Sequence, residues 1–273
     1  MVTDAQSDIE FNIQAHNKVA SKYAAIHGEI YNQYEQSRLH ASLKEAIDFI
    51  QCTDGTKRNR VLDLGCGAGN LTDHLVSLGA EVIASDVSPG FLSQIQRRYP
   101  KTSVTTLQLN GSDLGNLQEN SLDMIATYSV LHHIPDYLGI IDECMRVLKP
   151  GGILYLDHEV PDQYWSNTVA LKKFYKEAQR FWPHRITKFL RPENYVDFFI
   201  RKFHNPRYRR EGDIHVFADD HIEWQKIAER VNQHGYMLIQ RDYLLYRSGF
   251  NYETYERHKN SLSDMRLGIY RKG

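Results

Sequence analysis

Cysteine is scarce in this sequence, which contains Cys52, Cys66 and Cys144 and no C-x-x-C pair. This usage argues against a disulfide framework and against a cysteine-ligated zinc site, and it favours a reducing compartment. A run of about 18 apolar residues, the length that a membrane helix needs, is also missing. The first residues, MVTDAQSDIEF, are acidic and lack the apolar stretch of a secretory signal. We therefore expect a cytoplasmic protein without a membrane span.

An excess of charge of either sign is missing as well. The chain has 33 Lys and Arg against 34 Asp and Glu, a formal net charge of -1. No overall field therefore attracts nucleic acid, and we expect neither DNA nor RNA as a partner. The basic run at 201–210 lies beside acidic residues, and we interpret it first as a solvated loop face. The second interpretation is a clamp for a substrate phosphate or carboxylate, and the third is an RNA contact. A homodimer is compatible with this composition.

Short apolar segments alternate with helical periodicity between residues 59 and 160. Strands are predicted at 60–64, 81–86, 103–110, 121–130 and 153–160, and helices at 70–79, 88–99 and 136–149. This alternation predicts parallel βαβ units and an α/β, Rossmann-like, doubly wound sheet. Two further strands, at 237–247 and 265–272, would complete seven mostly parallel strands, with one antiparallel edge strand in the last pair.

Four segments divide the chain. Residues 1–56 are predicted to form a helical N-terminal cap, and residues 57–160 the core. Residues 161–222, rich in aromatic side chains, interrupt the alternation and are predicted to form a helical lid inserted after the fifth strand. Residues 223–273 supply a helix and the strands that complete the core sheet.

A glycine-rich turn follows the first predicted strand in VLDLGCGAGN. Gly65, Gly67 and Gly69 lie at the carboxyl end of that strand, where open α/β sheets bind ligands. A turn without a ligand would need one glycine, so three within five residues favour a binding site. The dinucleotide pattern G-x-G-x-x-G fails because its third glycine would fall on Asn70, and the phosphate loop GxxxxGK is absent.

The string D-L-G-x-G-x-G that starts at Asp63 resembles motif I of the class I S-adenosylmethionine (SAM)-dependent methyltransferases. YSVLHHIPD and RVLKPGGILYL are similar to signatures of the small-molecule branch of that family, and the resemblance covers about residues 57–160. It implies SAM as methyl donor and S-adenosylhomocysteine as product. The cofactor-binding residues that it implies in and near the strand ends are Asp63, Gly65, Cys66, Gly67, Asp86, Val87 and Tyr128.

Three of the implied contacts have alternatives. Asp86 would bind both ribose hydroxyls, and its place 21 residues after Gly65 fits an acidic residue about 20 positions on, although it could merely cap a helix. Asp113 and the backbone amide of Leu114 would contact adenine, with 111–112 as the alternative. Tyr23, in the predicted cap, would contact the methionine end, and its alternative is packing between amphipathic helices.

The chemistry expected at this site is an in-line displacement at the sulfonium methyl group, with SAM-dependent methylation of a small-molecule acceptor, at oxygen first. The protein must align the acceptor, exclude water and, if needed, take a proton. Base candidates are His132 and His133 after the fourth strand, and Asp157 and His158 at the end of the fifth. Their alternative is packing near the cofactor. No metal is expected, and a tRNA or protein methyltransferase or a non-catalytic SAM-binding regulatory protein remain as alternatives.

Overall fold

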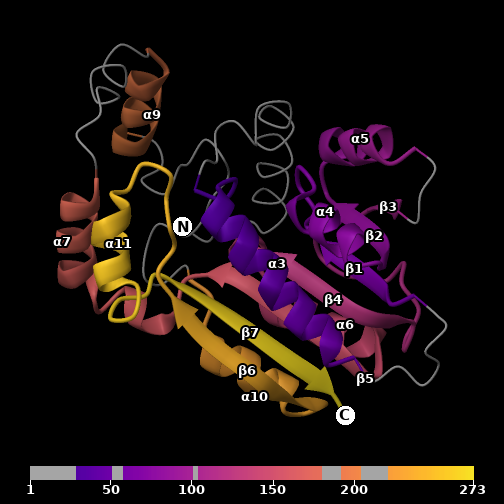
Figure 1. Ribbon diagram of the computed structural model, residues 1–273. Helices are drawn as coiled ribbons and strands as arrows, with labels where there is room; N and C mark the ends of the chain where they lie inside the picture. Colours follow the sequence, from indigo (N-terminus) through magenta and orange to yellow (C-terminus); the bar gives the residue numbers. More distant parts are fainter. Residues whose placement is uncertain (1–28, 51–57, 101–103, 180–191, 204–220) are drawn as a thin grey trace.

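The computed structural model describes residues 29–50, 58–100, 104–179, 192–203 and 221–273 of the chain (Figure 1). Its centre is a seven-stranded sheet with the order β3-β2-β1-β4-β5-β7-β6. The strands are β1 (Arg60–Leu64), β2 (Glu81–Asp86), β3 (Val104–Gln108), β4 (Leu122–Tyr128), β5 (Leu148–Glu159), β6 (Gly235–Tyr243) and β7 (Met265–Lys272). Strands β1 to β5 run parallel, whereas β7 is antiparallel to both of its neighbours. The predicted fold class is therefore confirmed.

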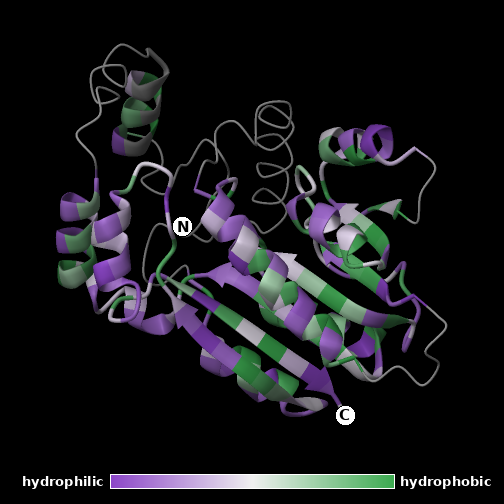
Figure 2. Ribbon diagram, viewed as in Figure 1, coloured by the Kyte–Doolittle hydropathy of each residue, from purple (hydrophilic) through white to green (hydrophobic). Residues whose placement is uncertain are grey.

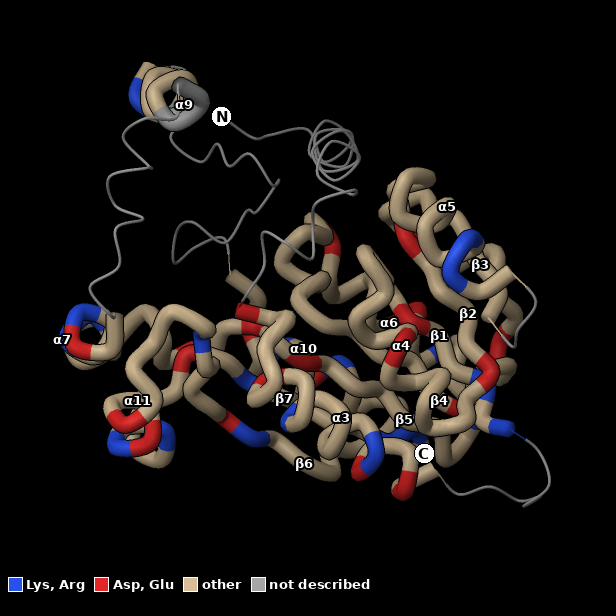
Figure 3. The backbone as a smooth tube through the Cα atoms, turned by 45° about the horizontal axis from the view of Figure 1, so that its top comes forward, with Lys and Arg blue, Asp and Glu red and all other residues tan. Residues whose placement is uncertain are grey.

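Helices cover both faces of the sheet. On one face lie α3 (Gln33–Asp48), α4 (Asn70–Ser77) and α5 (Pro89–Arg98), and on the other lie α6 (Tyr137–Val147) and α10 (Trp224–Val231). Apolar side chains line the central strands because both of their faces are covered, and hydrophilic residues lie on the outer helical faces (Figure 2). Basic and acidic residues are interspersed over the described fold (Figure 3).

Three elements differ from the prediction. Strand β5 starts at Leu148, which pairs with Leu122, so Lys-Pro-Gly-Gly lies inside the strand with Gly151 at a φ of 78°. Helix α10 covers Trp224–Val231, which is shorter than the helix that the pattern of residues 219–235 predicts. A helix that was not predicted, α11 (Tyr252–His258), separates β6 from β7, so these two paired strands do not form a tight hairpin.

The remaining described helices belong to the segments outside the core. Helix α3 is the described part of the predicted cap, and its N-cap Asn32 accepts hydrogen bonds from the amides of Tyr34 and Glu35. The predicted lid contains the 3-10 turn η3 (Asp162–Tyr164) and the helices α7 (Thr168–Ala178) and α9 (Pro192–Phe203). Among the described residues, no helix is both long and apolar enough to cross a membrane. The segment boundaries stay predictions.

Candidate functional site

A pocket opens at the carboxyl ends of β1, β2 and β4. Most of the predicted site residues in the described chain line it, namely Asp63, Gly65, Cys66, Gly67, Asp86, Val87, Asp113, Tyr128 and His133. Of the ten residues predicted to bind the cofactor, two are not among the described residues that line the pocket. Leu114 lies elsewhere in the structure, and Tyr23 lies outside the described residues. The pocket sits where parallel sheets of this class bind their ligands.

The glycine turn forms the floor of the pocket because its backbone requires glycine. Gly65, Gly67 and Gly69 have φ values of 73°, 49° and 91°, all in the left-handed region. A Cβ atom on Gly65 would come within 2.6 Å of the Val130 Cγ2 atom, so β1 and the end of β4 could not approach this closely with any other residue. The amide of Cys66 donates to the Ser85 carbonyl, which ties the turn to β2. Burial raises the pKa of the Cys66 thiol, so the thiol stays protonated.

Asp86 joins the two loops at one side of the pocket. It is 6% exposed, and its Oδ2 atom accepts a hydrogen bond from the Gly67 amide at 2.9 Å. Its Oδ1 atom accepts one from the Ser88 amide at 2.8 Å. The N-cap of α5 is Ser88 itself, whose hydroxyl accepts from the Phe91 amide. Asp86 therefore does not cap that helix directly, and its carboxylate fixes the glycine turn at the pocket wall.

Asp63 is fully buried at the bottom of the pocket. Its Oδ2 atom accepts a hydrogen bond from the Thr72 hydroxyl at 2.5 Å. Its Oδ1 atom has no hydrogen-bond partner among the described residues. Burial raises the pKa of Asp63 to about 7, since a carboxylate loses its hydration there. An unsatisfied buried carboxylate oxygen that lines a pocket is suited to a cationic or hydrogen-bond-donating ligand.

The loop after β3 contributes Gly111 and Asp113 to the pocket. The Asp113 carboxylate accepts hydrogen bonds from the Gly115 amide and the Asn110 side chain, and these bonds hold its pKa below the usual range. Leu114 is packed in the core, and its amide donates to Glu143 Oε2 at 3.2 Å. A ligand in the pocket would therefore compete with Glu143 for the amide that the sequence assigned to adenine.

Helix α3 and the residues before it form the opposite wall. The Tyr128 hydroxyl donates to Glu35 Oε1 at 2.9 Å, which links β4 to α3. Tyr31 also lines the pocket, and its buried hydroxyl has no partner in the described part of the chain. In this segment Tyr23 was predicted as the contact, and Tyr31 was not identified. The only signal in the sequence was that both residues are tyrosines, and residue type alone does not tell which of them lines the pocket.

The two histidines after β4 have different surroundings. They lie in the 3-10 turn η2 (Leu131–His133), with their ring centroids 4.1 Å apart. His132 is buried, and its Nδ1 atom lies 2.7 Å from Glu159 Oε2. The other carboxylate oxygen of Glu159 accepts the amides of Val130 and Leu131. His133 is half-buried and lines the pocket.

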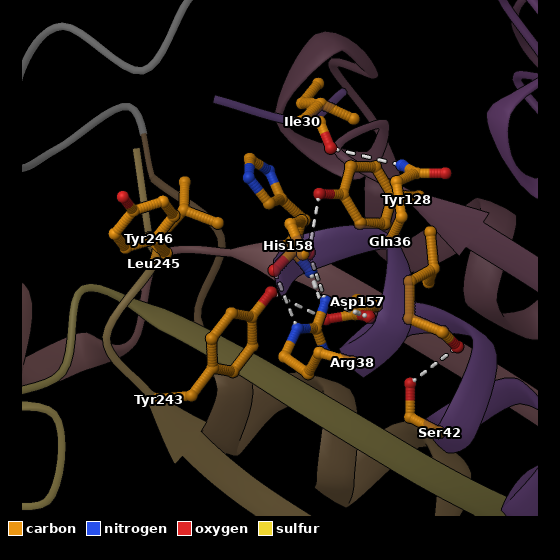
Figure 4. A network of polar contacts seen from close by, with 12 residues as sticks. Ile30, Gln36, Arg38, Ser42, Tyr128, Asp157, His158, Tyr243, Leu245 and Tyr246 are labelled. Atoms are coloured by element: carbon orange, nitrogen blue, oxygen red, sulfur yellow. Dashed lines mark hydrogen bonds and ion pairs between the residues drawn. The ribbon is translucent and has the colours of Figure 1, made fainter. Parts of the chain in front are cut away.

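Asp157 belongs to a buried polar network behind the pocket (Figure 4). Its Oδ2 atom accepts hydrogen bonds from Arg38 at 2.9 Å and from the Tyr155 hydroxyl at 2.6 Å. Its Oδ1 atom accepts one from the Tyr243 hydroxyl at 2.9 Å. Arg38 also bonds both oxygens of Glu35. Both oxygens of Asp157 are therefore engaged by side chains from α3, β5 and β6, and the residue does not line the pocket.

Comparison with known proteins agrees with this geometry. Residues 62–156 match a family model described as a methyltransferase domain. The match runs from β1 into β5 and so covers the strands whose carboxyl ends form the pocket. Solved SAM-dependent methyltransferases resemble the chain as a whole. The one from Mesorhizobium loti has a TM-score of 0.52 at 16% identity and covers 85% of this chain and 96% of its own. The one from Methanosarcina mazei has a TM-score of 0.52 at 20% identity and covers 83% and 95%. At sequence identities this low, the structural similarity shows that the chains share a fold and nothing more specific.

Curated relatives of the methyltransferase domain are ubiquinone biosynthesis O-methyltransferases. The enzyme of Xanthomonas oryzae pv. oryzae is 34% identical over 151 residues, which cover 52% of this chain and 60% of the relative. That of Methylococcus capsulatus is 28% identical over 123 residues, which cover 44% and 52%. The matched part thus spans less than two thirds of the relatives' length.

Proposed function

We propose that this chain transfers the methyl group of SAM to a hydroxyl oxygen of a small-molecule acceptor. The observation that carries the proposal is the pairing of two buried carboxylates, Asp63 and Asp86, around a three-glycine turn in a single pocket. The curated relatives, named as O-methyltransferases, support oxygen as the methylated atom.

The residues fit SAM from one end of the pocket to the other. The partnerless Oδ1 atom of Asp63 would accept a hydrogen bond from the ammonium group of the methionine moiety. The Asp86 carboxylate, already oriented by the amides of Gly67 and Ser88, would accept the ribose hydroxyls. Gly111 and Asp113 would lie against the adenine, since the Leu114 amide is engaged by Glu143. Tyr31 lines the pocket from the cap segment, and the contact of Tyr23 with the methionine end stays a prediction.

The bound sulfonium supplies an activated methyl group, so the protein's part is alignment, exclusion of water and removal of a proton. Among the predicted catalytic residues, His133 lines the pocket and would contact the substrates there. His132 would help to position the backbone after β4 and would not contact the substrates. Its ring is held by Glu159, which also accepts a hydrogen bond from the Val130 amide. Asp157 would act similarly, because its bond to Arg38 holds α3 against β5. These roles stay predictions.

Isothermal titration with S-adenosylhomocysteine, and with NAD as the parallel titrant, tests the cofactor. We expect micromolar-range binding of the first, about -8 kcal/mol, and no heat from the second. Binding of NAD in place of S-adenosylhomocysteine would contradict the proposal. If only S-adenosylhomocysteine binds, transfer of a radiolabelled methyl group from SAM to hydroxyl compounds distinguishes an enzyme from a protein that merely binds the cofactor.

We further expect the acceptor to be a free small molecule. The balanced charge of the chain argues against RNA, and basic and acidic residues are interspersed along the described backbone (Figure 3). A cytoplasmic location and a homodimer stay predictions, which fractionation and light scattering would check.

The titration of Asp63 gives the cofactor site a pH dependence. Its pKa of about 7 in the unliganded protein means that it is about half protonated at neutral pH. An ammonium group beside Oδ1 favours the carboxylate, so protons and S-adenosylhomocysteine compete. We expect the affinity to be constant above pH 7.5 and to fall below pH 7, approaching tenfold per pH unit. Titration calorimetry from pH 5.5 to 8.5 measures this.

The variant Asp63→Asn is the control for this pH dependence. It preserves the shape of the side chain and cannot ionise, so its affinity should be weak and nearly independent of pH over the same range. A wild-type affinity that stays constant from pH 5.5 to 8.5 would show that the bound ligand does not depend on the ionised form of Asp63.

A further inference from the structure

His158, near the end of β5, combines two features that cost stability. Its side chain is 8% exposed, and neither ring nitrogen has a hydrogen-bond partner among the described residues. Its backbone φ is 62°, in the left-handed region that residues other than glycine seldom adopt. A buried unpaired polar group and a strained backbone are each unfavourable, and such features concentrate where proteins bind or react with ligands.

A β-bulge explains how the ring reaches its position. Leu156 pairs with Gly268 and Glu159 pairs with Arg266, so three residue steps on β5 oppose two on β7. Consecutive side chains of a regular strand point to opposite faces. Here Asp157 faces α3 through Arg38, and the next side chain, His158, still stacks on Tyr128, whose hydroxyl also faces α3. Bulges of this kind redirect side chains beside active sites.

The redirected ring lies next to the pocket. The His158 and Tyr128 rings are stacked, with centroids 4.5 Å apart and an angle of 23° between their planes, and Tyr128 lines the pocket. Among the described residues, the non-glycine residues with positive φ are Asn120, Ser129 and His158. Ser129 also lines the pocket, and its amide donates to the Asp157 carbonyl. In Figure 4 the His158 ring points away from the Arg38–Asp157 network.

We propose that His158 binds the hydroxyl group of the methyl acceptor and takes its proton as the methyl group is transferred. The inference rests on the proposed O-methylation and adds to it the residue that contacts the acceptor. The acceptor would occupy the side of Tyr128 on which His158 lies, and its hydroxyl would give an imidazole nitrogen the partner that the described chain does not supply.

The proton balance is consistent with the state of the ring. The carbon–sulfur bond of the sulfonium breaks as the carbon–oxygen bond forms, and the proton of the hydroxyl passes to the imidazole and then to water. Burial has the largest effect on the pKa of His158 and lowers it to about 4. The cations Arg38 and Arg247 act in the same direction, and the carboxylates of Asp157 and Glu159 oppose them. The ring is therefore neutral at physiological pH. Such a weak base can accept the proton because the oxygen becomes strongly acidic as it gains the methyl group.

Two variants test this role. His158→Phe keeps a stacking ring without nitrogens, and His158→Asn keeps a polar group that tolerates the left-handed backbone. The assay follows transfer of a radiolabelled methyl group from SAM to catechol, 4-hydroxybenzoate and glycerol. For whichever probe the wild-type protein methylates, we expect both variants to lower kcat on the order of 100-fold. The KM for SAM and the Kd for S-adenosylhomocysteine should not change. The melting temperature of His158→Phe should not fall, since an unsatisfied group is removed.

The matched controls are His234→Phe and His234→Asn, at an exposed residue just before β6. Retention of the wild-type kcat by His158→Phe would overturn the inference and leave the proposed function intact. A lower melting temperature together with weaker S-adenosylhomocysteine binding would also overturn it, because His158 would then support the fold. A wild-type protein that binds S-adenosylhomocysteine but methylates none of the probes would contradict the proposed O-methylation itself.

Discussion

Replacing Asp86 by alanine is expected to weaken the binding of S-adenosylhomocysteine at least about 100-fold. Hydrogen bonds to a charged acceptor are worth about 1.5–3 kcal/mol each, and the variant loses those proposed to the ribose hydroxyls. It also releases the amides of Gly67 and Ser88, which the carboxylate now holds at 2.9 and 2.8 Å. The glycine turn would then lose its orientation as well as its ligand contact. Titration calorimetry of the two proteins measures the difference.

The control for this comparison is Asp48→Ala, at the end of α3, where the carboxylate is 60% exposed and pairs with Lys44. Its affinity should equal that of the wild-type protein. Circular dichroism would verify that Asp86→Ala is folded. An affinity within threefold of wild type in a folded Asp86→Ala variant would mean that the ligand lies elsewhere than along β2.

Replacing Arg38 by methionine is expected to lower the free energy of unfolding by roughly 3–5 kcal/mol, the usual cost of leaving buried charges without their partner. Arg38 is the cation between Glu35, 2% exposed, and Asp157, fully buried. Burial already raises the pKa of Glu35, and the guanidinium opposes that effect. Urea unfolding followed by circular dichroism gives the change in free energy.

The triple variant Arg38→Met, Glu35→Gln, Asp157→Asn separates charge from packing. It removes the two uncompensated charges, so it should recover part of the stability lost by Arg38→Met. Lys44→Met, which breaks an exposed ion pair on the same helix, should change the free energy of unfolding by less than about 1 kcal/mol. A triple variant no more stable than Arg38→Met would show that the guanidinium acts mainly through its contact with the Tyr243 ring.

The core fold could be predicted from the sequence because its signals are local. Apolar strands, the Ser88 cap and the glycine turn each fit within about ten residues, and the structure has β1, α4, β2 and α5 where the sequence indicated them. The start of β5 was missed because Pro150 and Gly151 are usually breakers, whereas pairing with Leu122 extends this strand through them. Helix α11 was missed because a short helix between two strands has a weak pattern.

The site could be predicted where its residues lie in one local motif, and it could not be predicted where its contacts join residues far apart in the sequence. The pocket residues of the glycine turn and the end of β2 lie in one contiguous motif. The environment of Asp157 depends on Arg38 and Tyr243, which are far away in sequence, so no local pattern indicates that its carboxylate is already engaged. Likewise, a β-bulge depends on the partner strand, so the orientation of His158 could not be derived from β5 alone.

The order in which the strands are made differs from the order in which they lie side by side. β7 follows β6 in the sequence, yet it lies between β5 and β6 and pairs with both. While the chain emerges from the ribosome, β5 therefore presents an open backbone edge until β7 is made, and β6 cannot join the sheet before then. Such an edge invites pairing with other chains. A nascent chain halted before Met265 could pair β1 to β5 and would leave the backbone edge of β5 exposed. We expect chaperone binding to matter most in this state.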